Sequence, residues 1–363
     1  TVSHLFFGKN SIVPAFMWYD RQLHRFVRPL APHDTPLIEK RLDAIGRPLL
    51  TGGSAVCAPY VAGALCTSLM PDDIDIQSRM ALMRGFQLMY RYVLHPTVSF
   101  QIIFLGIRRM LRSMFGKNRP QTVDAFIRQV RHFGQQLLFS DIMRNEIIRV
   151  FSKGYSPYYV DYVLYDEMAH ENGKLHTLAF EALRQVDRDI RIMLGAMYRS
   201  YQSTHVYIFS DHGHMDAVPF SSTAHVSIET QLQQWFNESS AHFTTSDIFE
   251  TGNPGSHRIF ACASGSLLQI YFKGTDIKPT LEGEIETRYP GSIQRIMQTP
   301  GIGGVVTRVS CDIRHIHTKV GVIRVRNGKV DDGPVSEGMD LLRVTQKDLD
   351  SFAAYVMYPD VGD

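Results

Sequence analysis

The stretch THVYIFSDHGHMD, residues 204–216, decides the fold that this sequence predicts. Residues 204–209 are mostly apolar, with β-branched and aromatic side chains, as in a buried strand. The run then changes abruptly to Asp211, His212 and Gly213. A buried strand needs only a turn at its end, so two side chains that bind metal ions well are unexpected there. We interpret them as the start of a functional site.

An earlier stretch repeats this order. YYVDYVLYDEMAH, residues 158–170, begins with an aromatic and β-branched run over 158–165 and continues to Asp166 and His170. Between the two stretches, residues 174–202 place apolar side chains three or four apart, which predicts an amphipathic helix. A strand, a helix and a second strand of these lengths predict a right-handed parallel crossover.

A metal site is predicted from two Asp/His pairs, Asp166 with His170 and Asp211 with His212. The carboxyl ends of parallel strands meet at one edge of the sheet, where α/β folds bind ligands. Neighbouring strands lie about 4.8 Å apart, so the two pairs would face each other. Carboxylates and imidazoles suit Zn²⁺ or a similar divalent ion, and two pairs predict two ions. Two ions about 3.5–4 Å apart hold both oxygens of an in-line phosphoryl displacement, and Gly213 would let the backbone pass close.

Each residue also has a simpler interpretation when taken alone. Asp166 could be the N-cap of the following helix, and His170 could be a packed or surface imidazole. The tripeptide Asp-His-Gly is common in turns. His214 is a weak candidate for binding substrate phosphate, and solvent exposure is the simpler interpretation of this residue. The joint arrangement on consecutive strand ends favours metal binding.

Composition narrows the classes of protein. The chain has 363 residues, of which 44% are hydrophobic and 20% are charged, as in an ordinary globular protein with a large core. The net charge of +2 gives no reason to expect a nucleic-acid partner. Four scattered cysteines without a CxxC pair exclude a cysteine zinc site and a dense disulfide scaffold.

Two regions bear on membranes. Residues 48–70 carry no charge, but their Gly, Pro, Ser and Thr residues predict an interior loop leading into a buried helix rather than a membrane span. Residues 74–150 combine apolar side chains at helical spacing with many arginines, which predicts a basic helical insertion. Such a face would attract anionic lipid head groups, so an anionic membrane surface is an expected partner of this insertion.

The C-terminal part alternates strands and helices, as one continuing α/β fold would. Strands are predicted at residues 266–272 and 320–325, and a helix is predicted at residues 291–298. Near the start of the chain, residues 18–20 are expected to pack and to form a turn rather than a platform for stacking bases.

The motifs resemble those of the alkaline phosphatase superfamily, in the branch of type I phosphodiesterases and nucleotide pyrophosphatases. Uncharacterised bacterial members of that branch, some with holin-like membrane segments, have similar stretches elsewhere. The resembling segments are SDHG (210–213), the D-x-x-x-H element in YDEMAH (165–170), GKNSIVPAFMWYD (8–20), RPLLTGGSAVCAPYVAGA (47–64) and TPGIGGVV (299–306).

This resemblance implies a doubly wound α/β fold, with a mostly parallel sheet flanked by helices. Residues 1–363 would form one such domain, and residues 74–150 would be an insertion within it. The family also implies two zinc ions and a Thr or Ser nucleophile that is transiently phosphorylated. Six metal-binding side chains are expected besides this nucleophile, of which the chain carries four.

The resemblance also places functional residues outside the chain. The nucleophile and the first-strand Asp would precede Thr1, and the distal His would follow Asp363. The chain is therefore expected to be a fragment that lacks both ends, which puts its own turnover in doubt. Ser54, in a Gly-Gly loop, is a weak internal candidate for the nucleophile, with Thr1 and Ser3 as further positions.

Three other histidines are weaker candidates for the distal ligand. His315 and His317 alternate along a predicted strand and are expected to line one exposed face, and His257 follows a Gly-Pro loop. Cys57 faintly resembles the start of the sulfatase C-x-P-x-R element, but the arginine is missing.

The predicted function is metal-dependent hydrolysis of phosphate esters, with diesters or pyrophosphates favoured over monoesters as small-molecule substrates. Other activities of the superfamily are alternatives: sulfatase, cofactor-independent phosphoglycerate mutase and phosphonate hydrolase. A non-catalytic protein that binds membrane surfaces through residues 74–150 is an alternative from another class. The compartment stays open, with association to a bacterial membrane as one expectation.

Overall fold

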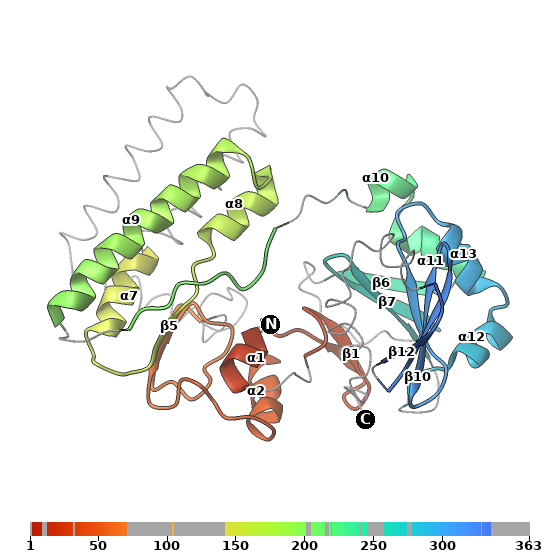
Figure 1. Cartoon of the computed structure of the whole chain (residues 1–363), viewed down its shortest axis with the longest axis horizontal. Helices are drawn as coiled ribbons and strands as arrows, with labels where there is room; N and C mark the ends of the chain where they lie inside the picture. Colours follow the sequence, from red (N-terminus) through yellow and green to blue (C-terminus); the bar gives the residue numbers. More distant parts are fainter. Residues whose placement is uncertain are drawn as a thin grey trace. The chain divides into compact units, whose positions relative to one another are not determined.

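The computed structural model describes residues 2–8, 13–31, 33–70, 104, 142–200, 205–214, 218, 220–239, 241–245, 258–273, 278–327 and 329–334. Contacts divide the chain into two units. Unit 1 contains residues 1–11 and 30–216, and unit 2 contains residues 12–29 and 217–363. The architecture is mixed α/β (Figure 1), which confirms the predicted class in its coarse form. The assignment of residues 1–363 to one domain stays a prediction.

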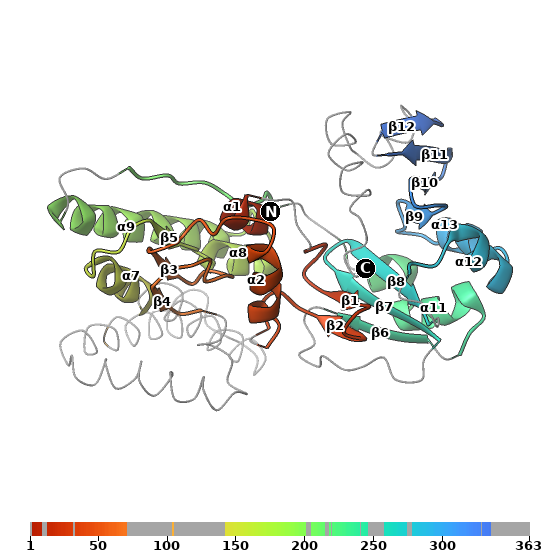
Figure 2. The ribbon, with the colours of Figure 1, turned by 90° about the horizontal axis from the view of Figure 1, so that it is seen from below.

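Unit 1 is built on a three-stranded parallel sheet in the order β4-β3-β5. Its strands are β3 (Ser54–Val56), β4 (Cys66–Ser68) and β5 (Tyr158–Val160). The helices described in this unit are α1 (Val2–Phe7), α2 (Thr35–Asp43), α7 (Met143–Phe151), α8 (Leu164–Asn172) and α9 (Thr177–Ser200). Figure 2 shows α7 and α9 beside the sheet, where Met143, Ile147 and Met193 pack against Val56.

A close backbone approach joins β3 to β5. A Cβ atom built on Gly53 would lie 2.1 Å from the carbonyl oxygen of Pro157, so glycine is required there. The N–H of Ser54 donates to that carbonyl at 2.8 Å, and the N–H of Asp161 donates to Val56 O at 3.2 Å. The pairing therefore extends past both ends of β5 and places Asp161 at the carboxyl edge of the sheet.

Two buried carboxylates attach α7 to the rest of unit 1. The Asp189 side chain on α9 is fully buried and accepts hydrogen bonds from Arg144 at 2.7 Å and from Gln185 at 3.0 Å. Glu146, also buried, accepts a hydrogen bond from the hydroxyl of Ser68 on β4 at 2.7 Å. A buried charge is costly unless it is paired, so these contacts fix the register of α7.

We expect the Asp189→Ala variant to lower the free energy of unfolding by about 3–5 kcal/mol, because it leaves the Arg144 guanidinium without its buried partner. Urea denaturation followed by circular dichroism measures this loss. The matched control is Asp187→Ala, which removes an exposed carboxylate paired with Arg191 at 3.7 Å, and should change stability by less than about 0.5 kcal/mol. Equal losses in both variants would contradict the role given to Asp189.

The predicted helix at 174–202 is confirmed by α9, but the two strands predicted around it differ from the structure. The first strand, predicted at 158–165, ends at Val160, and α8 begins at Leu164. The second, predicted at 204–209, is wrong. Residues 205–210 belong to no helix or strand and pair with no strand among the described residues. Tyr207 is 83% exposed and Ile208 is 70% exposed, so the apolar run is not buried and the parallel crossover does not form.

The buried helix predicted to follow the loop within 48–70 is also wrong, since these residues form turns and the strands β3 and β4. No described helix has the length and apolar character needed to cross a membrane. Of the insertion predicted at 74–150, residues 74–103, 105–141 and the arginines they contain lie outside the described residues.

Unit 2 begins with the hairpin of β1 (Trp18–Asp20) and β2 (Arg25–Val27). Trp18 is buried, and the carboxylate of Asp20 accepts hydrogen bonds from the N–H groups of Gln22 and Leu23, both at 3.1 Å. These contacts confirm the predicted packing and turn at residues 18–20. Met17 and Phe26 pack against β7 in a cluster with Phe260 and Cys262.

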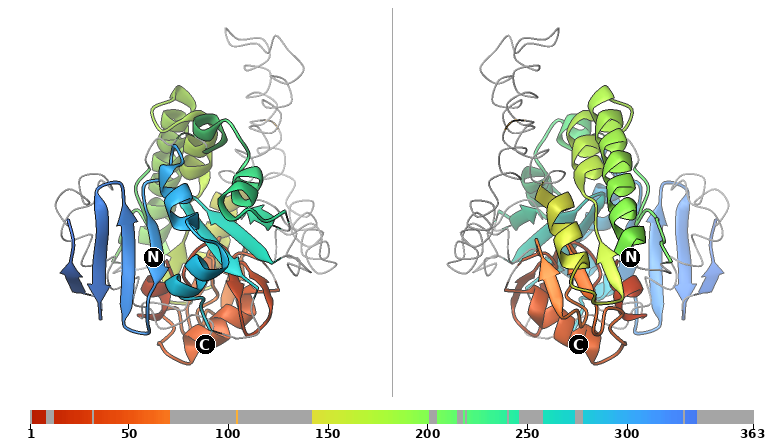
Figure 3. Two further views of the ribbon diagram at one scale, coloured as in Figure 1. Left: turned by 90° about the vertical axis from the view of Figure 1, so that its right-hand side faces the viewer. Right: turned by 90° about the vertical axis from the view of Figure 1, so that its left-hand side faces the viewer.

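The rest of unit 2 has two sheets and several short helices. The strands β6 (Ala241–Thr245), β7 (Ile259–Ser264) and β8 (Leu267–Phe272) form a three-stranded sheet. A four-stranded antiparallel sheet, blue in Figure 3, contains β9 (Val305–Arg308), β10 (Ile313–Thr318), β11 (Gly321–Arg326) and β12 (Lys329–Asp332). The helices are α10 (Phe220–Ala224), α11 (Ile228–Phe236), α12 (Glu282–Arg288) and α13 (Ser292–Gln298). The strands predicted at 266–272 and 320–325 and the helix predicted at 291–298 are therefore confirmed.

Candidate functional site

Helix α8 presents Asp166 and His170 on one face. Leu164 and Met168 are fully buried on the other face, where they pack against α9. Because residues four apart lie one above the other on a helix, Asp166 Oδ1 comes within 3.4 Å of His170 Nε2. The two side chains are 42% and 63% exposed, so the pair is open to solvent. The helix ends at Gly173, whose φ of 96° suits glycine.

His214 joins this pair. The ring centroids of His170 and His214 lie 4.7 Å apart. Asp166, His170 and His214 each offer one ligand atom, and these three atoms lie within 4.8 Å of one another. His214, a weak sequence candidate for binding substrate phosphate, thus lies where a third metal ligand would be expected.

Asp211 and His212 form the second pair. His212 Nε2 lies 3.3 Å from Asp211 Oδ2, and His212 Nδ1 lies 3.0 Å from the carbonyl oxygen of Gly213. Since a carbonyl only accepts hydrogen bonds, Nδ1 carries the hydrogen of this contact, and in the neutral ring Nε2 would offer a lone pair, as metal-binding histidines usually do. The hydrogen bond to Gly213 raises the pKa of His212; burial opposes this effect, and the nearby carboxylates add to it.

A Cβ atom built on Gly213 meets no protein atom within 4 Å, so no protein neighbour requires glycine there, and the close passage expected beside a metal site stays a prediction.

Asp161 is a site residue that the sequence reasoning missed. It follows β5 directly, at the carboxyl edge of the sheet. Burial, reinforced by the charges of Asp211 and Asp166, raises the pKa of Asp161 to about 6, although His212 partly offsets this effect. Because Asp166, Asp211 and His212 all affect this pKa, members of both predicted Asp/His pairs lie near Asp161 in unit 1. The sequence signal for Asp161 is a single charged residue inside the apolar run over 158–165, which predicts a strand through this position.

The spacing within each pair suits a divalent ion. Bonds of about 2.0–2.1 Å in a tetrahedral zinc site separate neighbouring ligand atoms by about 3.3 Å. The observed separations are 3.4 Å between Asp166 and His170 and 3.3 Å between Asp211 and His212. Both pairs could therefore bind an ion with little rearrangement.

The internal candidates for the nucleophile are poorly placed. Ser54 is fully buried at the first position of β3, two residues before the carboxyl end of that strand. Ser3 is buried in α1, and Thr1 lies outside the described residues. Burial and the charge of Asp161 raise the pKa of Cys57 to about 12, so this thiol stays protonated.

The remaining histidine candidates lie in or near unit 2. His315 and His317 lie on one face of β10, as predicted, but that face is not exposed. Their side chains are 25% and 13% exposed and contact Glu282. His257 lies outside the described residues.

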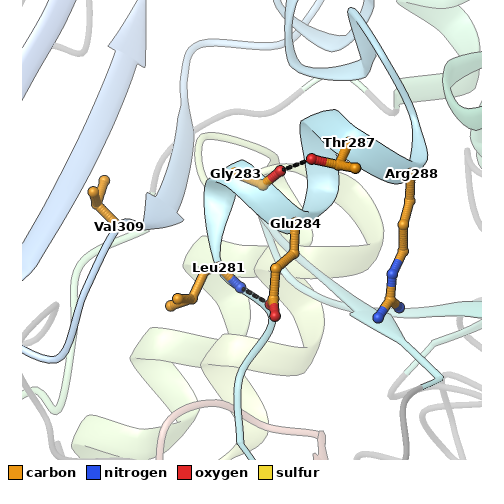
Figure 4. A pocket seen from close by; sticks show the side chains of 6 residues that line it. All are labelled: Leu281, Gly283, Glu284, Thr287, Arg288 and Val309. Atoms are coloured by element: carbon orange, nitrogen blue, oxygen red, sulfur yellow. Dashed lines mark hydrogen bonds between the residues drawn. The ribbon is translucent and has the colours of Figure 1, made fainter.

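Unit 2 has an open pocket beside α12 (Figure 4). Its rim is held by hydrogen bonds from Leu281 N–H to Glu284 and from the Thr287 hydroxyl to the carbonyl of Gly283. Arg288 and Val309 complete the lining. None of these residues belongs to the Asp/His groups, so the pocket is not part of the candidate metal centre.

We expect the Asp161→Asn variant to stabilise the metal-free protein at pH 8 by about 1–2 kcal/mol. In the folded protein the pKa is about 6, against about 3.9 in the unfolded chain. The ionised carboxylate therefore costs stability above pH 6, and this cost disappears as the pH falls toward 4. Urea denaturation in EDTA at pH 8 and pH 4 measures the gain.

Asp187→Asn, at an exposed position of α9, is the control for this experiment. A gain from Asp161→Asn of the same size at both pH values would show that charge repulsion is not its cause.

Comparison of the chain with protein-family models, with curated proteins and with solved structures finds no match.

Proposed function

We propose that this protein is a metal-dependent hydrolase of phosphate esters that binds two divalent ions, most readily Zn²⁺, at the carboxyl edge of the parallel sheet in unit 1. The observation that carries the proposal is the group of Asp166, His170 and His214, whose ligand atoms lie within 4.8 Å of one another. Beside it, burial together with the charges of Asp211 and Asp166 raises the pKa of Asp161 to about 6. Carboxylates that repel one another at neutral pH gain most from a bound cation.

The two groups of ligands can be assigned to separate ions. One ion would be held by Asp166, His170 and His214, whose ligand atoms lie within 4.8 Å of one another. Asp211 and His212 would hold the other ion. The carboxylate of Asp161 lies near both residues and would add a negative charge beside that ion. His214 would then supply a ligand that the family resemblance expects from a distal histidine beyond Asp363.

Two such ions would lower the pKa of a nucleophilic hydroxyl and neutralise charge on the phosphoryl oxygens. The residues of this chain would bind the ions and leave them accessible to a substrate. The Nδ1–H of His212 is bound to a backbone carbonyl, which orients Nε2. The half-exposed side chains of Asp166 and His170 leave room for a substrate to approach.

The finer fold and the reaction class rest on the motif resemblance. The D-x-x-x-H spacing in YDEMAH and the SDHG tetrapeptide favour an alkaline phosphatase-like, doubly wound fold and hydrolysis of diesters or pyrophosphates. The parallel order β4-β3-β5, with helices packed against it, is compatible with such a core. The nucleophilic Thr or Ser is then the one that the resemblance places before Thr1.

The alternatives stay predictions. A sulfatase would need a reactive cysteine, and the raised pKa of Cys57 gives no support for one in this chain. Binding of a membrane surface would depend on residues 74–150, most of which lie outside the described residues.

Metal analysis tests the proposal directly. After dialysis against Zn²⁺, the purified protein should hold two ions at its unit 1 site, and each of His170→Ala and Asp211→Ala should lose about one of them. In the longer protein that would include the expected nucleophile, the same two variants should hydrolyse bis(p-nitrophenyl) phosphate more than about 100-fold more slowly, since even changes behind the direct ligands cost 10–100-fold.

The control is His176→Ala, which removes an exposed histidine from the same unit without touching either group. It should keep both the zinc content and the activity. Zinc content that is unchanged in His170→Ala and in Asp211→Ala would refute the proposed site.

A further inference from the structure

A second cluster of metal-binding side chains lies in unit 2, apart from the groups described above. Glu282 is the first residue of α12, and His315 and His317 lie two residues apart on β10. Residues two apart on a strand point to the same face, so both imidazoles face the carboxylate. The three ligand atoms lie within 4.8 Å of one another.

The contacts of this cluster converge on a single oxygen atom. Glu282 Oε2 lies 2.9 Å from His315 Nδ1, 3.2 Å from His317 Nε2 and 2.5 Å from the hydroxyl oxygen of Thr307. The same hydroxyl also lies 2.9 Å from His317 Nε2. A carboxylate oxygen has about two lone-pair sites, so Oε2 can accept from the Thr307 hydroxyl and from one imidazole in good geometry, but not from the second imidazole as well.

We propose that Glu282, His315 and His317 form a divalent transition-metal site, with Oε2, Nδ1 and Nε2 respectively as the ligand atoms. The two separations from Oε2, 2.9 and 3.2 Å, are close to the spacing of about 3.3 Å between ligands of tetrahedral zinc. Two imidazoles and one carboxylate suit Zn²⁺ and related divalent transition-metal ions.

A bound ion resolves the crowding around Glu282. Each imidazole would direct a lone pair at the ion instead of a hydrogen at the oxygen, and the Thr307 hydroxyl would remain as a donor to the carboxylate. The side chains are 25%, 13% and 22% exposed for His315, His317 and Glu282, so the cluster is sheltered but reachable from solvent.

Metal ligands bind in their deprotonated forms, so Glu282 would bind the ion as a carboxylate and each histidine as a neutral imidazole. The ion would connect the start of α12 to the sheet of β9 and β10.

Zinc stoichiometry of the full chain tests the site. The experiment uses a background variant, His170→Ala with Asp211→Ala, so that the proposed unit 1 site does not add to the count. Equilibrium dialysis against Zn²⁺ should leave one ion per chain bound through the unit 2 cluster. Glu282→Gln and His315→Gln, each made in this background, should remove that ion.

The matched control is His225→Asn, which replaces an exposed histidine of unit 2 at a φ of 58°, where asparagine is well tolerated. It should keep the ion. If the cluster only forms hydrogen bonds, the two Gln variants would bind as much zinc as the background variant. That result would overturn the proposal.

A second measurement needs no change in the cluster, in case the Gln variants do not fold. Histidine ring signals of the background variant are followed by nuclear magnetic resonance as Zn²⁺ is added, with assignment of His225 as an internal reference. The signals of His315 and His317 should shift together and saturate at one equivalent. Signals that do not move at saturating Zn²⁺ would also overturn the proposal.

Discussion

The pairing of β3 with β5 is the constraint on which the rest of unit 1 depends. It requires glycine at position 53, because any side chain there would collide with the carbonyl of Pro157. It also carries the parallel pairing one residue beyond β5, through the hydrogen bond from the N–H of Asp161 to the carbonyl of Val56. The chain can then turn from β5 into α8 within a few residues, which brings Asp161 and Asp166 to the same edge.

The cost of this arrangement is electrostatic. Like charges in a partly buried setting disfavour ionisation, and Asp161 shows this effect most clearly. A protein that needed only a stable fold would gain from replacing one of these carboxylates. Retaining several of them beside His212 is reasonable when a cation completes the group, as ligand sites are often held at the expense of stability.

Local patterns allowed much of the fold to be predicted. The helix α9 and the strands β8 and β11 follow from side-chain periodicity, which depends on neighbouring residues only. The approach of Asp166 to His170 follows from helical spacing in the same way. The strand expected at 204–209 failed for the opposite reason. An apolar run shows that a strand is favourable, but it does not show whether another strand lies beside it.

In the candidate sites, too, sequence patterns predict contacts between neighbouring residues but not contacts between distant ones. Asp161 lay within an aromatic run over 158–165, and the run alone does not reveal that the backbone leaves the sheet after Val160. His315 and His317 were visible as an alternating pair, whereas Glu282 is 33 residues earlier than His315 and is brought to it only by the packing of α12. Contacts between distant residues were therefore the part that sequence patterns could not supply.

The two units are interleaved along the chain, and this has a consequence for synthesis. The β1–β2 hairpin belongs to unit 2, although the segments on either side of it belong to unit 1. Its contacts include the hydrogen bond from Phe16 to Ser264, a separation of 248 residues. At about 5–20 residues per second, a nascent hairpin would wait roughly 10–50 s for β7 to leave the ribosome. During that time Tyr19 and Phe26 lack their native ring contacts with Phe260 and Tyr271, which makes this hairpin a natural place for a chaperone to bind.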